Sequence, residues 1–589
     1  MVRLKTLSIV FLLSMGLSAH TKEGILPAVS DPWLSSPNAA GLTRYAFGNM
    51  GMAELSLTKG KGGFVDFSGS PDALSVDASV ASFFRLNSHA VVYGAMSYTN
   101  FSGRDMAGSA FIQSLPTASS LPVRYTATAS QSSRHLPFDI VEDSLTNTGT
   151  KHQDTYRLTG ALGYDLYKGF SLGARLDYTA ANLAKYKDLR HKNKLMDLDL
   201  TAGFYLPLNI GDRASLGLGA NYLYHRTTES LQFSTYGKND KVYNSLVSYA
   251  NFMGHLEQFG MNGYTDKSRE MPLVSDYNGV GAQLNLQSSI FNYYNAFTYA
   301  HRRGYYGRRS PYTITYADHE SDVYRYNAQL SLTSRHSRLA LDLSLSAENL
   351  RNDATNYREL QNEQGATYNE YYTPVKTANK LWTDGTVALT VELGNLKPPL
   401  RGEVGGGSKP PLRGEVGGGS KPSLRGEVGG GLGLPLWLFR AGLNWHHREQ
   451  TAYVYPFARR QDISSREPFV SLCRNIVAAR KHAAYWTLAL DFSFLKGSGQ
   501  PFEDFTYQAP SDKQEQPPTM DAYLWREYTW LTAAQYHIGG SAAYSFILPG
   551  PRLRTFLRLS LSHRKANEGS IYSQGCDFTT ATFAVGCTF

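Results

Sequence analysis

Charged side chains that alternate with apolar ones are the residues of this 589-residue chain best placed to do chemistry. They are acids and arginines, which bind solutes through charge-assisted hydrogen bonds. The two signs are nearly balanced, so this face suits either crossed acid–arginine pairs or a route for a neutral or zwitterionic solute. The candidates are Arg85, Arg157, Arg175, Asp177, Asp197, Asp199, Arg325, Asp342, Glu348, Glu392, Arg440, Asp491, Arg554 and Arg558.

No catalytic or metal-binding motif accompanies these charges. The sequence has no GxxxxGK[ST], CxxC or GxSxG, and His319-Glu320 lacks the second histidine of HExxH. His446 and His447 are adjacent, and adjacent strand residues point to opposite faces, so a shared metal site is not expected. We predict no catalytic residue, no metal site and no cofactor.

Three arginine pairs, at 302–303, 308–309 and 459–460, fall in segments that we predict to be outer loops. They could contact lipopolysaccharide phosphates or an anionic solute, or they could simply form a solvated loop surface. The net charge of +9 also suits nucleic acid. Because the basic residues are scattered over many loops of an exported chain, we exclude nucleic acid as a partner.

The segments that carry the charges have a period of two. Segments of about ten residues alternate apolar with polar or small side chains, which is the signal of a half-buried strand. This pattern occurs at 170–179, 198–206, 216–224, 280–286, 339–348, 387–393, 437–445 and 486–494. A soluble sandwich shows the same alternation, so the pattern alone does not fix the fold class.

The connections between the segments alternate between short and long, and this decides the fold class. Outer-membrane barrels place short turns in the periplasm and long loops outside. Short turns occur at 87–89, 167–169, 209–212, 335–337 and 549–551, and long stretches at 102–154, 181–194, 227–277, 303–323, 349–379, 447–483 and 509–527. We predict an all-β, antiparallel transmembrane barrel of about 16–18 strands, with the candidate charges facing its lumen.

Both ends of the chain agree with export to the outer membrane. Arg3 and Lys5 precede the apolar stretch 7–17, and small residues follow as far as Ala19, which predicts a secretory signal at residues 1–19. The last segment alternates up to a terminal aromatic residue, Phe589. This looks like the C-terminal strand that the barrel-assembly machinery recognises in bacterial outer-membrane proteins.

Domain boundaries follow from these elements. We predict that residues 20–44 form an N-terminal periplasmic segment and that residues 45–589 form the barrel. Within the barrel, residues 397–431 contain a Gly/Pro-rich 12-residue repeat, which cannot carry a strand ladder and is expected to be a flexible insert in a periplasmic turn. The repeat is either a tether for a periplasmic partner or a tandem duplication that a loop tolerates cheaply.

The N-terminal motif carries a family resemblance. Residues 31–34 (Asp-Pro-Trp-Leu) and 38–42 (Asn-Ala-Ala-Gly-Leu), the hairpin at Asn87 and the terminal Phe589 resemble a family of uncharacterised outer-membrane β-barrel proteins from the Bacteroidota. The resemblance spans the mature chain except residues 397–431. It implies a barrel in the bacterial outer membrane and supplies no functional residues.

Three functions remain open from the sequence. The first is a porin-like channel or transporter for a small polar solute. The second is a non-conducting, surface-binding or assembly barrel whose lumen is filled with charge. The third is an outer-membrane hydrolase, for which we identify no acid/His or Ser/His cluster. The expected partners are outer-membrane lipid and lipopolysaccharide, the barrel-assembly machinery and a small polar solute.

Overall fold

The protein is described here from a computed structural model. It describes residues 32–588 except 46–48, 67, 115–135, 138, 142–147, 168, 188–189, 211–213, 235–242, 251–252, 260–270, 311–312, 335–336, 397–433, 455, 480–483, 508–520, 549–552 and 568–574. The predicted signal, the 397–431 repeat and Phe589 therefore lie outside the described residues and stay predictions.

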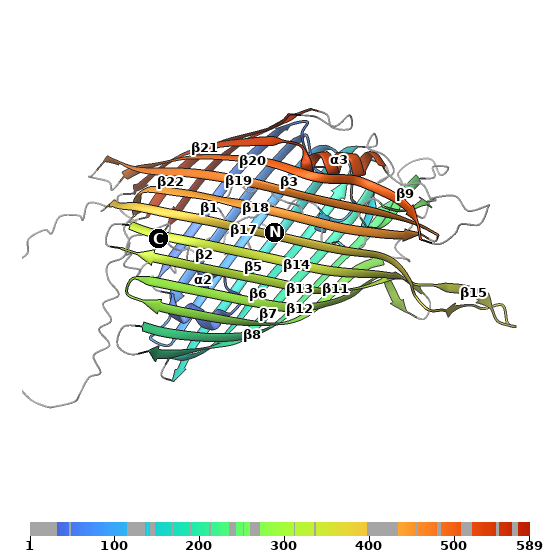
Figure 1. The fold of residues 1–589 in the computed structure, drawn as a ribbon, viewed down its shortest axis with the longest axis horizontal. Helices are drawn as coiled ribbons and strands as arrows, with labels where there is room; N and C mark the ends of the chain where they lie inside the picture. The colour runs from blue at the N-terminus through green and yellow to red at the C-terminus, as the bar shows by residue number, and fades with distance from the viewer. Residues whose placement is uncertain are drawn as a thin grey trace, which may run out of the picture.

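Eighteen antiparallel strands form a closed barrel, because the first strand, β1, pairs with both β2 and the last strand, β23 (Figure 1). Closure leaves no sheet edge, so every strand can satisfy its backbone groups within the wall. The predicted fold class is confirmed, at the upper end of the predicted strand number. The strands are β1 Met50–Gly62, β2 Asp72–Arg85, β3 Ala90–Met106, β5 Gly149–Tyr167, β6 Phe170–Lys185, β7 Arg190–Ile210, β8 Ala214–Ser234, β11 Met271–Ser288, β12 Phe291–Ser310, β13 Thr313–Thr333, β14 Ser337–Ala354, β17 Val375–Leu396, β18 Leu434–Val454, β19 Phe457–Ala479, β20 Ala484–Thr506, β21 Gln535–Ile547, β22 Arg554–Ala566 and β23 Asp577–Thr588.

The outward face carries an apolar band. Along β20 the outward side chains from Trp486 to Phe494 are large and apolar, and Leu490 is 65% exposed. This length matches the roughly 9–11 residues with which a tilted strand crosses a membrane. Aromatic rows border the band, as interfacial girdles do. They include Tyr164, Trp437, Trp486 and Tyr544 at the short-turn end, and Tyr98, Tyr224, Tyr299 and Tyr324 at the long-loop end. The protein is an outer-membrane barrel.

The strands continue beyond the band at the long-loop end, where the outward face becomes charged. Arg226 on β8 pairs with Asp276 on β11 at 3.3 Å, just past Tyr224. Here the structure differs from the loops expected from sequence. Residues 181–194 and 303–323 are mostly the tops of paired strands, because a wall above the membrane is wet on both faces and loses its apolar alternation.

The prediction of a long loop at 447–483 was wrong. It contains β19, a full strand that pairs with β18 and β20. Its outward face holds few large apolar residues within the band, and Pro468 and Arg474 interrupt them. Residues 498–506 belong to the upper part of β20.

The described part of the N-terminal segment lies inside the barrel rather than outside it. It consists of the short helix α2, Pro32–Ser35, and the 3-10 helix η2, Ala39–Arg44, and it contacts the inner wall near the short turns (Figure 1). We call Pro32–Tyr45 the lumenal segment. The N-terminal periplasmic segment predicted for residues 20–44 stays a prediction, and its described residues, from 32 onward, lie against the inner wall.

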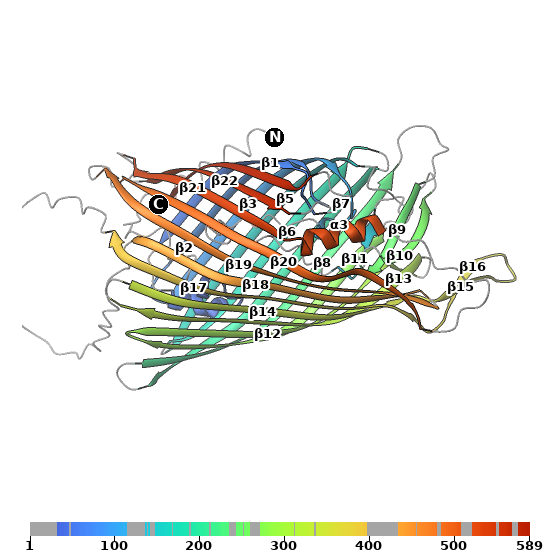
Figure 2. The same cartoon turned by 45° about the horizontal axis from the view of Figure 1, so that its top comes forward.

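Folded loops occupy the long-loop end (Figure 2). β4 Asp139–Val141, β9 Tyr243–Ala250 and β10 Met253–Phe259 form a three-stranded sheet, and α3 Asp521–Thr532 follows β20. β15 Tyr357–Gln361 and β16 Thr367–Tyr371 form a hairpin that projects beyond the wall. Among the described residues, no helix has the length and apolar composition needed to cross a membrane.

Candidate functional site

The candidate site is the lumen, and the structure places all fourteen predicted residues on its wall. Each alternates with outward neighbours: Arg175 and Asp177, for example, flank Leu176, which is 41% exposed on the outer face. Ten of the fourteen lie on β2, β5–β7, β13, β14 and β17, and four lie on β18, β20 and β22. Because β17 pairs with β18, the lumenal charges are spread around the wall rather than gathered on one side.

Several of these charges are neutralised by close partners. Arg175 holds Asp177 with its Nε 2.6 Å from Oδ2, and Arg558 holds Glu54 of β1. Arg338 pairs with Glu392 at 3.8 Å, and the Gln329 amide donates to Asp342 at 2.8 Å. Of these contacts, Arg338–Glu392 and Gln329–Asp342 join neighbouring strands, whereas Arg175 and Asp177 are both on β6.

The mid-barrel charges are not all neutralised. We call Arg157, Asp177, Asp197, Asp199, His225 and Arg325 the central belt. Asp177 and Asp199 stand directly opposite each other on β6 and β7, an arrangement of like charges that costs energy unless it is compensated. Asp177 pairs with Arg175, and His225 Nε2 lies 2.8 Å from Asp197 Oδ1. Asp199 Oδ1, in contrast, is buried without a hydrogen-bond partner among the described residues.

Water reaches this belt from inside the barrel. The side chains of Asp197 and Asp177 are 40% and 36% exposed although they point inward. Arg325 and Asn327 on β13 and Ser344 on β14 are also exposed on the inward face. The middle of the lumen is therefore hydrated and polar, whereas both ends are filled by protein.

The lumenal segment fills the short-turn end. Trp33 lies edge-on to Tyr205 and Tyr294, with ring centroids 5.2 and 5.0 Å away. Asn38 donates to Phe204 O at 3.0 Å and to Gln283 Oε1 at 2.8 Å, so one side chain ties the segment to two strands. The segment is held by aromatic packing and by wall hydrogen bonds.

A row of wall glycines makes room for this segment. Gly163, Gly173 and Gly203 are directly opposite one another on β5, β6 and β7. A Cβ built on Gly173 would lie 2.1 Å from Ala40 N, and one on Gly203 would lie 2.6 Å from Asn38 Oδ1. The inner wall is bare of side chains along this row, so the backbone of the segment can lie against it.

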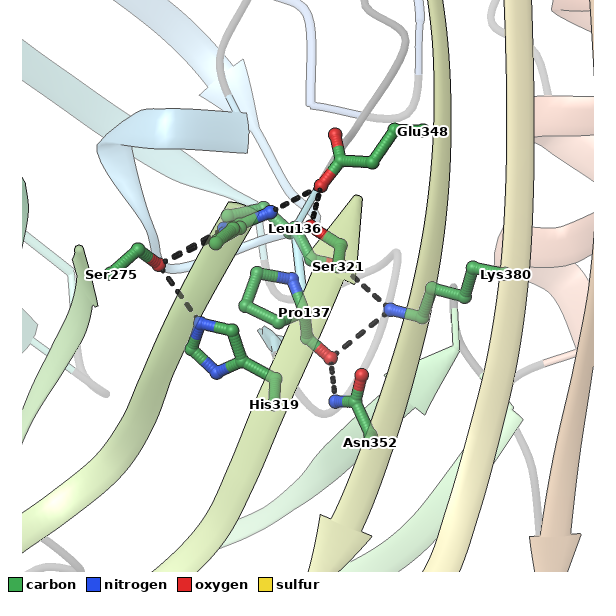
Figure 3. A network of polar contacts seen from close by, with 9 residues as sticks. Leu136, Pro137, Ser275, His319, Ser321, Glu348, Asn352 and Lys380 are labelled. Atoms are coloured by element: carbon green, nitrogen blue, oxygen red, sulfur yellow. Dashed lines mark hydrogen bonds and ion pairs between the residues drawn. The ribbon is translucent and has the colours of Figure 1, made fainter. Parts of the chain in front are cut away.

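Loop segments fill the long-loop end, and we call residues 106–114, 136–137, β4, β9, β10 and α3 the upper cap. Buried wall cations hold it: Lys151 Nζ donates to Ser109 O at 3.2 Å, and Lys380 Nζ donates to Leu136 O at 2.6 Å (Figure 3). Asn352 also donates to the Pro137 carbonyl. A buried cation needs such partners, because an unpaired one would be costly.

A buried carboxylate holds the first part of the cap. Glu229 lies on β8 beyond the aromatic row and accepts hydrogen bonds from the backbone nitrogens of Ile112 at 2.5 Å and Gln113 at 3.2 Å. Asn193 bridges Glu229 at 2.8 Å and Ala110 O at 2.7 Å. Burial raises the pKa of Glu229 to about 7, while the hydrogen bonds from Ile112, Asn193 and Gln113 favour its charged form.

A second buried network braces the wall beside Pro137. Arg302 donates to Glu348 at 2.9 Å and to Ser275, which also contacts His319 Nε2 at 2.9 Å (Figure 3). Ser321 donates to the same Glu348 oxygen at 2.7 Å. Glu348 therefore stabilises the wall rather than facing solute, and Arg302, predicted in an outer loop, is buried inside.

The α3 helix closes the cap against the other arc. Arg448 on β18 is fully buried and makes a two-pronged pair with Glu527 of α3, at 3.1 and 2.8 Å. Arg459 pairs with Asp521 at the start of the helix at 2.6 Å. Tyr523 and Leu524 pack in the apolar cluster beneath the cap. These arginines dock a helix, so neither acts as a free anion site.

Sequence reasoning missed the residues that hold the two ends. Lys151, Glu229, Lys380 and Arg448 all have inward parity, but they lie above the apolar band, where alternation gives no signal. His446 and His447 do face opposite sides of β18: His446 contacts Asp384 at 2.6 Å and His447 contacts Ser464 at 2.9 Å. Among the described residues, no group of three or more His, Cys, Asp or Glu could hold a metal ion.

Among the comparisons with known proteins, one family model matches part of the chain. Residues 123–395 match the model of a family of unknown function, DUF6850, which is less than half of the chain. This agrees with the predicted resemblance to an uncharacterised family, whereas the bacterial group named there stays a prediction. No curated protein matches the chain.

Solved outer-membrane proteins match the chain at very low identity and with low TM-scores. BauA, the ferric preacinetobactin receptor from Acinetobacter baumannii, is 8% identical with a TM-score of 0.36, covering 92% of this chain and 80% of BauA. The unliganded ferric citrate transporter FecA is 8% identical, with a TM-score of 0.37 and coverage of 92% and 78%. A mutant of the TodX monoaromatic hydrocarbon channel is 9% identical, with a TM-score of 0.28 and coverage of 95% and 93%.

Proposed function

We propose that the protein is a gated outer-membrane channel for small polar solutes. The observation that carries this proposal is a hydrated, charge-lined mid-lumen between two separate fillings, the lumenal segment and the upper cap. A barrel that only displays loops has no need of exposed charge such as Arg325 and Asp197 at its centre. Polar lining groups and electrostatic barriers are the means by which pores select solutes.

Each filling is attached to the wall by contacts that can be released, as a movable cover would be. The lumenal segment joins the wall through β1 and is otherwise held by side-chain contacts and a few hydrogen bonds. The cap is held by single side chains, such as Lys380 and Glu229, that donate to or accept from loop backbone. Such contacts can be released without unpairing a barrel strand, so the channel can open while its wall stays intact.

The test is solute flux through the purified full-length chain in liposomes. Swelling is measured in isotonic arabinose, glycine and a larger trisaccharide, for the parent protein and for a double variant that releases the lumenal segment and α3, Gly173→Val with Arg448→Met. We expect the small solutes to enter the double-variant vesicles about tenfold faster than the parent vesicles. This factor corresponds to a parent channel that is open about a tenth of the time and a variant that stays open. The trisaccharide should lag behind.

A folded double variant that admits no solute faster than protein-free vesicles would overturn the proposal. Retention of the heat-modifiable gel mobility typical of a folded barrel checks the fold of each variant. The sealed double variant would favour the second function, a non-conducting surface-binding barrel.

We also propose that the short-turn end faces the periplasm. β17 ends and β18 begins at that end, so the 397–431 repeat would lie inside the cell envelope, whereas the β15–β16 hairpin would be outside. Trypsin added to intact cells should cut at Arg358 in the hairpin and leave Arg401, Arg413 and Arg425 of the repeat uncut. Cleavage within the repeat on intact cells would reverse the orientation.

A further inference from the structure

We infer that the central belt is a binding site for a zwitterionic solute, one that carries an ammonium and a carboxylate, such as an amino acid or a short peptide. This inference rests on the proposed channel and names the class of solute that its lumen would favour. It is carried by one acid and two arginines that the wall leaves without a partner.

The acid is Asp199 on β7. Its neighbours are occupied: Thr159 donates to Asp177 at 2.6 Å, and His225 contacts Asp197 at 2.8 Å. Nothing among the described residues donates a hydrogen bond to Asp199, and its Oδ1 atom is buried. Burying a carboxylate without a hydrogen-bond donor costs desolvation free energy that no contact offsets. An incoming ammonium would therefore stabilise this position.

The cation is Arg325 on β13, which points inward, is exposed, and makes no ion pair or hydrogen bond with any described residue. Its charge acts on Asp199 of β7, although the two side chains form no ion pair. Arg157, on the other side of Asp199, faces Asp77 and Asp197 and likewise forms no direct pair within the described part of the chain. Guanidinium groups donate hydrogen bonds to carboxylates in a two-pronged geometry, so Arg325 can bind the carboxylate end of the solute.

The rest of the wall supports a solute of mixed charge. A single anion would be repelled by three carboxylates on β6 and β7, and a single cation would be repelled by Arg325 and by Arg175 and Arg157. A zwitterion with its ammonium toward Asp199 and its carboxylate toward Arg325 avoids both repulsions, which is how opposed charges select one partner against others.

The experiment is titration calorimetry on the purified full-length chain. The probes are glycylglycine and glycine, together with N-acetylglycine, which lacks the ammonium, and glycinamide, which lacks the carboxylate. We expect glycylglycine or glycine to bind at least about tenfold more tightly than both single-charge probes, a factor that one charged contact readily supplies. Tighter binding of glycylglycine than of glycine would indicate a peptide site, and the reverse order would indicate an amino-acid site.

Two variants assign the two ends of the solute. Asp199→Asn should weaken zwitterion binding about tenfold and leave N-acetylglycine unchanged, whereas Arg325→Gln should weaken it equally and leave glycinamide unchanged. Asp342→Asn is the matched control, since it removes an inward carboxylate that Gln329 already satisfies. It should bind the zwitterion as the parent does.

The outcomes separate this inference from the proposed channel. Equal binding of all four probes, or equal losses for every probe in both variants, would overturn the zwitterion site even if arabinose still entered the vesicles. Selective zwitterion binding in a barrel that admits no solute would support the site and count against the channel.

Discussion

Replacing Gly173 with valine should release the lumenal segment from the wall. The new Cβ would lie 2.1 Å from Ala40 N and 2.4 Å from Ala39 C, and these backbone atoms cannot swing aside as a flexible side chain can. Overpacking of this kind costs about 1–3 kcal/mol, which shifts the balance between docked and released segment by about fivefold to more than a hundredfold. The barrel wall itself should stay closed, because the substitution is β-branched and suits a strand.

The measurement is the labelling rate of a cysteine placed at Ser36, which is 4% exposed in the docked segment. A membrane-impermeant maleimide is used, with Cys576 and Cys587 replaced by serine to remove the accessible native thiols. Labelling should accelerate by the same factor as the release. Gly160→Val on β5 is the control, because a Cβ there meets nothing within 4 Å. Equal rates in Gly173→Val and the control would mean that the glycine row does not hold the segment.

Replacing Arg448 with methionine should free α3 from the upper cap. The change leaves the Glu527 carboxylate, 3% exposed, without the guanidinium that binds both of its oxygens. Breaking one partner of a buried pair costs about 3–5 kcal/mol, far more than the loss of a surface pair. Trypsin should then cut after Arg526, a buried residue of α3, about a hundredfold faster or more.

The control is a second arginine–glutamate pair that is open to water. Arg460 on β19 lies 2.9 Å from Glu449, and the two side chains are 43% and 41% exposed. Because exposed pairs contribute only about 0–1 kcal/mol, Arg460→Met should leave cleavage after Arg526 close to the parent rate. If Arg448→Met cleaved no faster than Arg460→Met, the helix would be held by its apolar contacts alone.

The sequence predicts most of the wall within the membrane because one rule applies to most of its strands. Lipid requires every second residue to be apolar, so Leu176 must face out and Arg175 and Asp177 must face in. The lumenal candidates therefore follow from parity. The same rule ends where the lipid ends: past Tyr224 both faces of β8 are wet, and the outward Arg226 no longer marks a strand. The extended strand tops were missed for this reason, whereas β19 was missed because Pro468 and Arg474 interrupt its outward apolar face.

The fillings of the lumen could not be predicted from local pattern. The lumenal segment has neither strand nor long-helix periodicity, and its docking depends on wall positions far along the chain, such as Gly173 and Tyr205. One signal was present in the sequence: the glycines at 163, 173 and 203 have inward parity but no side chain with which to line a lumen. Such a row becomes informative once strand register is known, which only the paired structure supplies.

The seam between β1 and β23 sets an order on assembly. Thr58 and Thr582 face each other there, so the wall cannot close until almost the whole chain has arrived. The segment that fills the lumen belongs to the first residues, directly before β1, yet it rests on strands β5 to β7. The earliest part of the chain can thus settle on an open sheet of partly built wall and be enclosed when the two ends meet. Entry after closure would require it to turn back through the mouth at the short-turn end.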